Sequence, residues 1–243
     1  MAIELPGELV WVMDLLGFHW PEVDEDRVRE FAGRVREFAS GLDGSHQAAT
    51  ATVRGMAEHY EADSYRVLAS RWRGMTVEHV DELVGVCGVV ATTIEVAADA
   101  VVAAKVAVIA QLTFAAVEFA AATAATAATF GAAAAAEAAL VEATRRVVDG
   151  ILRELEERIV AELLTQAVEP LERVVEGVLT GLVFPGARGA AAPAADGDGE
   201  VVGGFRVVPG ELVRHAELLQ EHADQVTSRA REFESTAAGV SFG

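Results

Sequence analysis

Hydrophobic residues recur along most of the chain with the period of an α-helix. Between residues 24 and 42 they are spaced alternately three and four positions apart, which places them on one face of a helix that packs along a seam. The residues of this face are Val28, Phe31, Val35, Phe38 and Leu42. Acidic residues gather at its start, where the helix dipole favours negative charge. The pattern predicts a helix over residues 24–42, which the stretch "SGLDGS" at 40–45 is expected to weaken or break.

A second helical region is predicted over residues 45–72. Its apolar residues first continue the seam and then form a face of their own. These residues are Val53, Met56, Tyr60, Tyr65, Leu68 and Trp72. We expect the helices over 24–42 and 45–72 to pair antiparallel, as a helical hairpin within residues 24–74.

The central part of the chain is rich in alanine and valine. Residues 77–130 are apolar almost all round, and a helix of that character is buried on most sides or faces lipid. Residues 132–182 carry an apolar stripe opposite a charged face and predict a return helix. Pro170 is expected to kink or divide this helix. The pattern therefore predicts a long Ala-rich helical hairpin over residues 75–182.

The last third contains the most evident linker. Gly, Ala, Pro and Asp dominate residues 183–206, a composition typical of flexible connections. Residues 207–243 then predict an amphipathic helix with Pro209 in its first turn. Its apolar residues are spaced four and three apart: Leu212, Ala216, Leu219, Ala223, Val226, Ala230 and Phe233. The expected fold is all-α, an elongated helical bundle of long antiparallel hairpins with a separate C-terminal helix after a flexible linker.

The N-terminal segment is rich in large aromatic side chains. "LVWVMDLLGFHWPEVDED" at 9–26 holds two tryptophans, yet it is not a signal peptide, because the preceding residues are acidic rather than basic. Its apolar run is also too short to span a bilayer. We interpret residues 1–23 as a short amphipathic plug, in which Trp11 and Trp20 are buried and close one end of the bundle.

The net charge and the absence of catalytic motifs exclude several classes of function. A net charge of −19 disfavours nucleic acid as a partner. A single cysteine, Cys87, excludes an intrachain disulfide framework and a cysteine-based zinc cluster. The sequence has no phosphate-binding glycine loop and no nucleophile elbow. His215 and His222 are seven positions apart on one helix face, and we interpret them as surface residues. No enzyme activity, cofactor or metal is predicted.

Two other function classes stay open. The Ala-rich hairpin could serve a membrane-active or pore-forming protein, although alanine and threonine gain little from lipid and a membrane span is not favoured. A plain oligomeric scaffold is the third possibility. Leakage of liposomes would separate the first class from a non-membrane function.

The opening segment resembles a known family. "LPGELVWVMDLLG…WPEVDED", followed by the seamed helix, is similar to the N-terminal domain of actinobacterial type VII (ESX) secretion substrates. It is close to the WXG-like, CpnT-like domain that precedes toxins in polymorphic effectors. The resemblance covers residues 1–182, most clearly the first 45. Residues 207–243 are similar to the first helix of small ESX secretion-associated proteins. The Tyr-x-x-x-Asp/Glu export signal is absent, and the literal Trp-x-Gly at 72–74 follows the expected turn near Tyr60.

The resemblance implies a non-catalytic helical module that delivers an effector. Such a module is secreted or lies in the cell envelope without a cleaved signal peptide. It pairs with a small WXG-type helical-hairpin protein or with the type VII secretion machinery, and a homo-oligomer is left open. The residues expected to pack or to contact a partner are Trp11, Trp20, Val28, Phe31, Val35, Phe38, Tyr60, Tyr65, Trp72, Leu212, Leu219 and Phe233.

Overall fold

The computed structural model describes residues 2–75, 79–128, 134–181 and 206–242, and these are overwhelmingly helical. The all-α prediction is therefore confirmed. The helices are α1 (Val10–Leu16), α2 (Glu25–Gly55), α3 (Asp63–Met75), α4 (Asp81–Ala128), α5 (Ala134–Leu163), α6 (Glu169–Gly181) and α7 (Pro209–Ala238). Short 3-10 turns cover Gly7–Leu9 and Met56–Glu58. The linker expected over 183–206 lies outside the described residues except for its last position.

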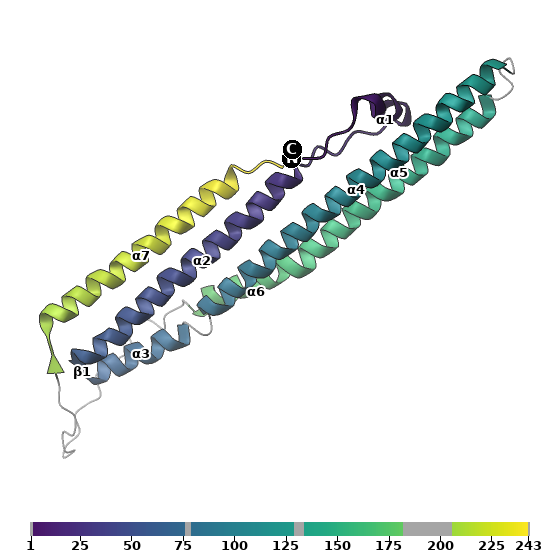
Figure 1. Cartoon of the computed structure of the whole chain (residues 1–243). Coiled ribbons are helices and arrows are strands. Elements are labelled where there is room, and N and C mark those ends of the chain that lie inside the picture. The colour runs from purple at the N-terminus through teal and green to yellow at the C-terminus, as the bar shows by residue number, and fades with distance from the viewer. Residues whose placement is uncertain (1, 76–78, 129–133, 182–205, 243) are drawn as a thin grey trace. The chain divides into compact units, whose positions relative to one another are not determined.

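The chain forms two compact units. Unit 1 comprises Met1–Ala32, Thr92–Gln166 and Val240–Gly243, and unit 2 comprises Gly33–Ala91 and Ala167–Gly239. In unit 1, α4 and α5 form a long antiparallel hairpin, as predicted (Figure 1). The 48 residues of α4 correspond to a helix about 70 Å long.

The core of unit 1 lies where α1 packs against this hairpin. Four residues of the N-terminal segment enter it, together with four of α4 and one of α5. They are Leu9, Val12, Met13, Leu16, Val108, Leu112, Ala115, Phe119 and Val148. Because these α4 positions are well before the end of the helix, α1 covers the side of the hairpin rather than one end of it.

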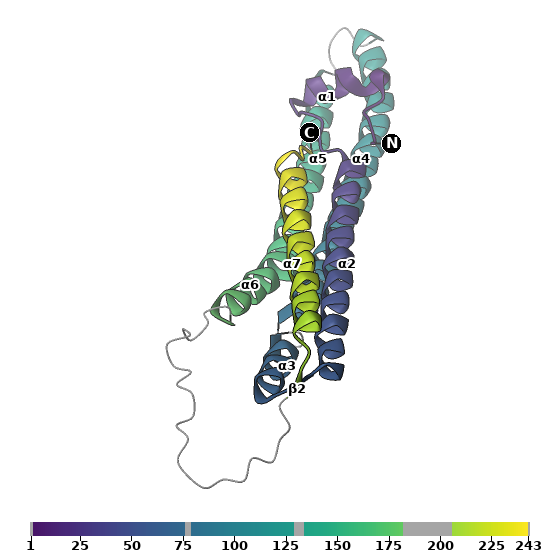
Figure 2. The same cartoon turned by 90° about the vertical axis from the view of Figure 1, so that its left-hand side faces the viewer.

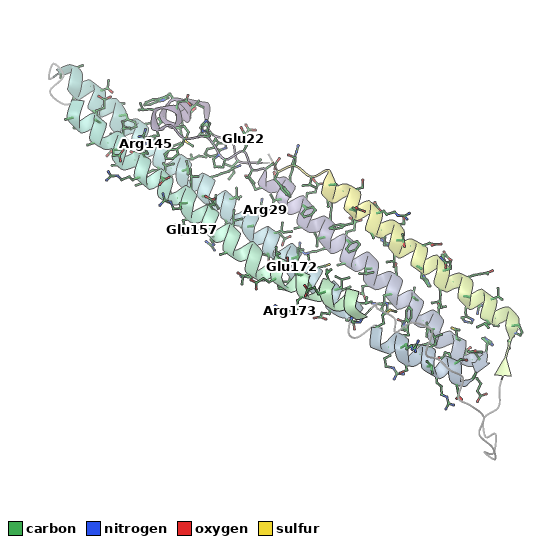
Figure 3. The ribbon with its side chains drawn as sticks, turned by 180° about the vertical axis from the view of Figure 1, so that it is seen from behind. Glu22, Arg29, Arg145, Glu157, Glu172 and Arg173 are labelled. Atoms are coloured by element: carbon green, nitrogen blue, oxygen red, sulfur yellow. The ribbon has the colours of Figure 1, made fainter. Side chains whose placement is uncertain are left out.

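The end of α1 is fixed by two kinds of contact. Gly17 adopts the left-handed conformation (φ 72°), and its N–H donates to Asp14 O while the N–H of Phe18 donates to Met13 O. These two bonds make a Schellman motif, which satisfies carbonyls that a helix end otherwise leaves unpaired. Arg145 reaches from α5 and donates through Nε to Leu16 O at 2.9 Å (Figure 3). The short α1 is thereby tied to α5 by its own C-terminus.

The segment around α1 is also fastened to α4 by a buried lysine. Lys105 Nζ donates to Ile3 O at 3.1 Å, to Val23 O at 2.7 Å and to the Glu25 carboxylate at 2.8 Å. The three N–H groups of the ammonium are therefore all used. Its Nζ also lies 5.8 Å from the centre of the Trp20 ring. One lysine thus holds both ends of the segment that contains α1.

In unit 2, α7 runs antiparallel to α2, and both views show them side by side (Figures 1 and 2). Phe38 and Phe233 stack with ring centroids 4.8 Å apart. At the other end the two-residue strands β1 (Tyr60–Glu61) and β2 (Arg206–Val207) pair antiparallel, with Tyr60 opposite Val207. The C-terminal helix is separate in sequence, yet in space it packs along α2.

The predicted break at 40–45 is wrong, because α2 continues unbroken to Gly55. The reversal lies at residues 56–62 instead, so the helices expected over 24–42 and 45–72 are replaced by α2 and the shorter α3. Gly41 has a packing role rather than a breaking one. A Cβ at this position would lie 3.2 Å from Cδ of Arg229, whose guanidinium crosses α2 here. A glycine inside a helix costs only about 1 kcal/mol, which the surrounding contacts offset.

The division expected at Pro170 is confirmed. A π-helical turn, Leu164–Val168, ends the α5 region, and Pro170 is the second residue of α6. A proline is tolerated there because the first N–H groups of a helix have no intrahelical partner. The side chain of Val174 is buried within unit 2.

Candidate partner-recognition surface

An aromatic contact attaches α3 to α2 in unit 2. The Trp72 ring lies parallel to the His46 ring, with centroids 5.3 Å apart and planes 7° apart. Its Nε1 donates to Thr50 Oγ1 at 2.9 Å. Desolvation lowers the pKa of His46, although Asp81 and Asp43 act in the opposite direction. The ring that stacks on Trp72 is therefore the neutral imidazole at pH 7.

Two tyrosines hold the other end of α3. Tyr65 donates its hydroxyl to Val53 O at 3.2 Å, in the last turn of α2, where carbonyls lack intrahelical donors. The Tyr60 ring meets the Tyr65 ring edge-on, with centroids 6.2 Å apart. Tyr60, Tyr65 and Trp72, which the sequence singled out, thus come together as the residues that position α3.

The outer side of α3 is exposed and basic. None of its residues is fully buried, and Val67 is exposed in the middle of the helix. The exposed arginines Arg66, Arg71 and Arg73 lie within eight positions, in a chain whose acidic residues outnumber its basic ones by 38 to 19. Arg66 pairs with Asp63 of the same helix. Guanidinium groups in this arrangement suit a partner that presents carboxylates.

The face that α7 turns towards α2 differs from the predicted stripe. Leu219 and Phe233 are half-buried as expected, but Leu212 is exposed. His215 is buried, so its interpretation as a surface residue is wrong. Its Nδ1 donates to Glu211 O at 2.6 Å.

Both histidines of α7 lie against the last turns of α2. His215 Nε2 lies beside Gly55 of α2, and a Cβ at Gly55 would be 3.5 Å from it, an ordinary van der Waals contact. His222 Nε2 lies 3.4 Å from Thr52 Oγ1, one turn earlier on α2. The seven-residue spacing of His215 and His222 places them on one face of α7. A sequence-based prediction favours the neighbouring stripe instead, because it contains large apolar residues.

The prediction that both N-terminal tryptophans are buried is wrong for Trp11. Its side chain is 49% exposed and touches the Phe119 ring at its edge, with centroids 6.2 Å apart. Trp20 is half-buried against the core of unit 1. Because α1 has only seven residues, it has one inward face, and Val12, Met13 and Leu16 occupy it. Trp11 therefore lies at the rim of this face.

The remaining predicted residues lie along α2. Val28 and Phe31 are half-buried in unit 1, where the Phe31 ring is 5.9 Å from that of Phe242. In unit 2, Val35 is buried and Phe38 is half-buried against α7. These four residues pack the helices rather than forming an exposed surface.

The described residues contain no cluster of side chains that could bind a metal ion. Among them, no group of three His, Cys, Asp or Glu side chains could hold an ion. The Cys87 thiol is enclosed, and burial raises its pKa, which reduces its nucleophilicity. Within the part of the chain that the structure describes, one helix, over Asp81–Ala125, is long and apolar enough to cross a membrane by length and composition, a test that core helices also pass.

A family model decides the classification. The WXG100-like domain matches residues 3–147, more than half of the chain. The chain belongs to the WXG100-like family. No curated protein and no solved structure matches. The matched range includes α1 to α4 and just under half of α5, so the α3 surface lies inside the WXG100-like domain and α7 lies beyond it. The chain is accordingly a helical protein of a family associated with type VII secretion.

Proposed function

We propose that this chain is a non-catalytic type VII secretion substrate, or the trafficking domain of a secreted effector, that pairs with a small helical partner. The observation that carries the proposal is the WXG100-like match over residues 3–147. It includes the opening segment whose residues resemble those of ESX substrates. The proposal places the chain outside the cell or in the cell envelope, with a toxin or other effector as cargo.

The outer side of α3 is the surface that we assign to partner recognition. Trp72 and Tyr65 fix the backbone of α3 on α2, so the exposed side chains are presented by a rigid element. Arg71 and Arg73 flank the exposed face that also carries Val67. A partner helix with an apolar residue between acidic ones would complement this surface, because charge pairs at the rim steer association.

Export should be tested in a host with and without its secretion ATPase. The tagged wild-type chain is expected in the culture supernatant only when the ATPase is present. The double variant Arg71→Glu/Arg73→Glu should be synthesised normally and exported several-fold less, since it reverses the charge of the recognition surface. Arg231→Glu, at an exposed position of α7, is the matched control. Equal amounts of the wild type outside both hosts would contradict the proposal.

The membrane-active alternative is favoured by one observation, the apolar character of α4. Insertion of α4 would first have to break the buried pair of Lys105 and Glu25, and isolated charges are costly in hydrocarbon. Leakage of dye-filled vesicles distinguishes the two. Leakage at low protein concentration, combined with ATPase-independent release, would put the alternative first.

A further inference from the structure

The C-terminal segment of unit 2 is bonded to the turn that leads into α3. We call residues 206–238, from β2 to the end of α7, the strap. Its strand β2 pairs antiparallel with β1, with Tyr60 opposite Val207 (Figure 2). The N–H of Val208 also donates to His59 O at 3.3 Å. The backbone of the turn between α2 and α3 is therefore held by a segment that is far away in the sequence.

A side-chain contact joins the same two segments. The His215 ring of α7 lies with its centroid 6.2 Å from that of the His59 ring in the turn. Of the residues of α7, which the structure describes throughout, His215 alone is buried. The most enclosed side chain of α7 therefore lies at the turn.

Tyr60 connects the strap to α3. Its backbone pairs with β2, and its hydroxyl oxygen lies 2.7 Å from Ser64 Oγ in the first turn of α3. Its ring meets the Tyr65 ring edge-on, and Tyr65 is the residue that bonds α3 to the last turn of α2. By holding Tyr60, the strap fixes the point from which α3 starts.

Neither α3 nor α7 is firmly held by burial alone. None of the residues of α3, all of which are described, is buried, and α7 buries only one. A helix of 13 residues, the length of α3, is marginal in water without tertiary contacts. Elements with few buried contacts open locally at a low free energy. Release of the strap would therefore leave α3 with Trp72 on α2 but without a fixed beginning.

We propose that the strap controls partner recognition within the same chain. When it is docked, it holds the turn and α3 presents its recognition surface; when it is released, α3 loosens and the surface is lost. This control rests on the proposed function, which assigns recognition to α3. The strap lies beyond the residues 3–147 that the WXG100-like model matches, whereas the turn and α3 lie within them. By linkage, a partner that binds the ordered α3 strengthens docking of the strap by the same factor.

Native-state hydrogen exchange of the full chain tests the coupling without any substitution. The amides of α3 and of the first half of α7 should show the same protection and the same dependence on urea, as one cooperative unit. Amides of α3 that stay protected after those of α7 have exchanged would overturn the proposal. Opening of α3 while α7 stays protected would overturn it as well.

A charge on the inner side of α7 should release the strap. Leu219 is half-buried one turn after His215, on the same side of the helix, and a carboxylate in that place is costly. In Leu219→Asp the amides of α3 should exchange several-fold faster, while those of α5 in unit 1 keep their wild-type rates. Val213→Asp is the matched control, because Val213 on the same helix is 58% exposed and its substitution should leave α3 protected. Faster exchange in α7 with unchanged exchange in α3 would refute the coupling.

A disulfide between β1 and β2 should reverse the effect of the released strap. In a Cys87→Ser/Leu219→Asp background, Glu61→Cys and Arg206→Cys place two cysteines directly opposite one another. Opposed residues of paired strands fall within the Cα separation of about 4.4–6.8 Å that a disulfide spans. The oxidised protein should recover the slow exchange of α3, and reduction should abolish it. Fast exchange of α3 in a protein whose disulfide is verified by mass would contradict the proposal.

Export separates this inference from the proposed function on which it rests. In the host that has its secretion ATPase, Leu219→Asp should be exported several-fold less than Val213→Asp. Equal export of the two variants, with the wild type still dependent on the ATPase, would overturn control by the strap and leave the secretion proposal intact. Release of the wild type without the ATPase would overturn the secretion proposal and the recognition role together, even where hydrogen exchange shows that the strap holds α3.

Discussion

The Lys105 ammonium lies 2.8 Å from a carboxylate oxygen of Glu25, and both side chains are almost completely enclosed, with exposures of 2% and 1%. Glu25 also accepts a hydrogen bond from the backbone N–H of Ile3 at 2.5 Å. The pair therefore joins three parts of unit 1: the first residues, the start of α2 and the middle of α4. Breaking a buried pair on one side leaves an uncompensated charge, which is the costly case.

Removal of the lysine charge should strongly destabilise the protein. Lys105→Met keeps most of the side-chain volume but leaves the Glu25 carboxylate buried without its cation, and we expect a loss of about 3–5 kcal/mol in the free energy of unfolding. Urea titration followed by circular dichroism measures it. The double variant Lys105→Met/Glu25→Leu should recover much of the loss. Asp99→Asn, which breaks the exposed pair with Arg29, is the control and should cost at most about 1 kcal/mol.

Acid should weaken unit 1 through the same pair. Burial raises the pKa of Glu25, but the hydrogen bonds from Lys105 and Ile3 outweigh it, and the net pKa lies below the ordinary value of 4.5. A lowered carboxyl pKa contributes stability that is complete above the unfolded-state pKa and disappears as the pH falls through the folded-state pKa. The urea midpoint of the wild type should therefore fall on acidification below about pH 4.5. Glu25→Gln should start lower and show a shallower fall, and an identical slope in both proteins would count against this explanation.

Gly17 should not tolerate a side chain. Its φ of 72° lies in the left-handed region, where a residue with a Cβ is strained by about 1–2 kcal/mol. Gly17→Ala should lower the melting temperature in thermal unfolding. Gly7→Ala serves as the control, because a Cβ there would contact nothing within 4 Å and its φ is not positive. Equal melting temperatures for the two variants would contradict the argument.

Two glycines of α2 should respond differently to alanine. At Gly44 a Cβ meets open space, so Gly44→Ala should stabilise the protein by about 0.5–1 kcal/mol through helix propensity. At Gly41 the same gain is opposed by displacement of Arg229. Gly41→Ala should therefore stabilise less than Gly44→Ala, or destabilise. In an Arg229→Ala background the difference between the two positions should shrink, and chemical denaturation of the four proteins would show whether it does.

The positions of the helices could be predicted from the sequence better than the contacts between them. Hydrophobic spacing located α2 and the α4–α5 hairpin, and Pro170 located the division before α6. Hydrophobic spacing did not reveal that α2 continues through residues 40–45. The low helix propensity of glycine can be read from the sequence, but the contact between Gly41 and Arg229 cannot, because the two residues are 188 positions apart. The exposure of Trp11 was missed for a similar reason. A seven-residue helix cannot bury every large side chain that it carries.

The polar residues of the packing faces were the hardest to predict. His215 was expected at the surface because imidazoles are usually exposed, whereas it is buried beside Gly55 of α2. Lys105 offered a usable signal, since it is the only cation of a long apolar helix and a buried cation requires a partner. Which acid supplies that partner depends on the path of the chain after α1, which periodicity does not specify.

The burial of Lys105 has a chemical consequence, because the chain contains no other lysine. All its other side-chain cations that are permanently charged are guanidinium groups, so the folded protein offers no accessible lysine amine to acylating reagents, aldehydes or ubiquitin-type conjugation. Lys105 becomes reactive only when the segment from Ile3 to Glu25 leaves α4. Modification of this one lysine, located by mass spectrometry, would therefore report the opening of unit 1 during export without any engineered label.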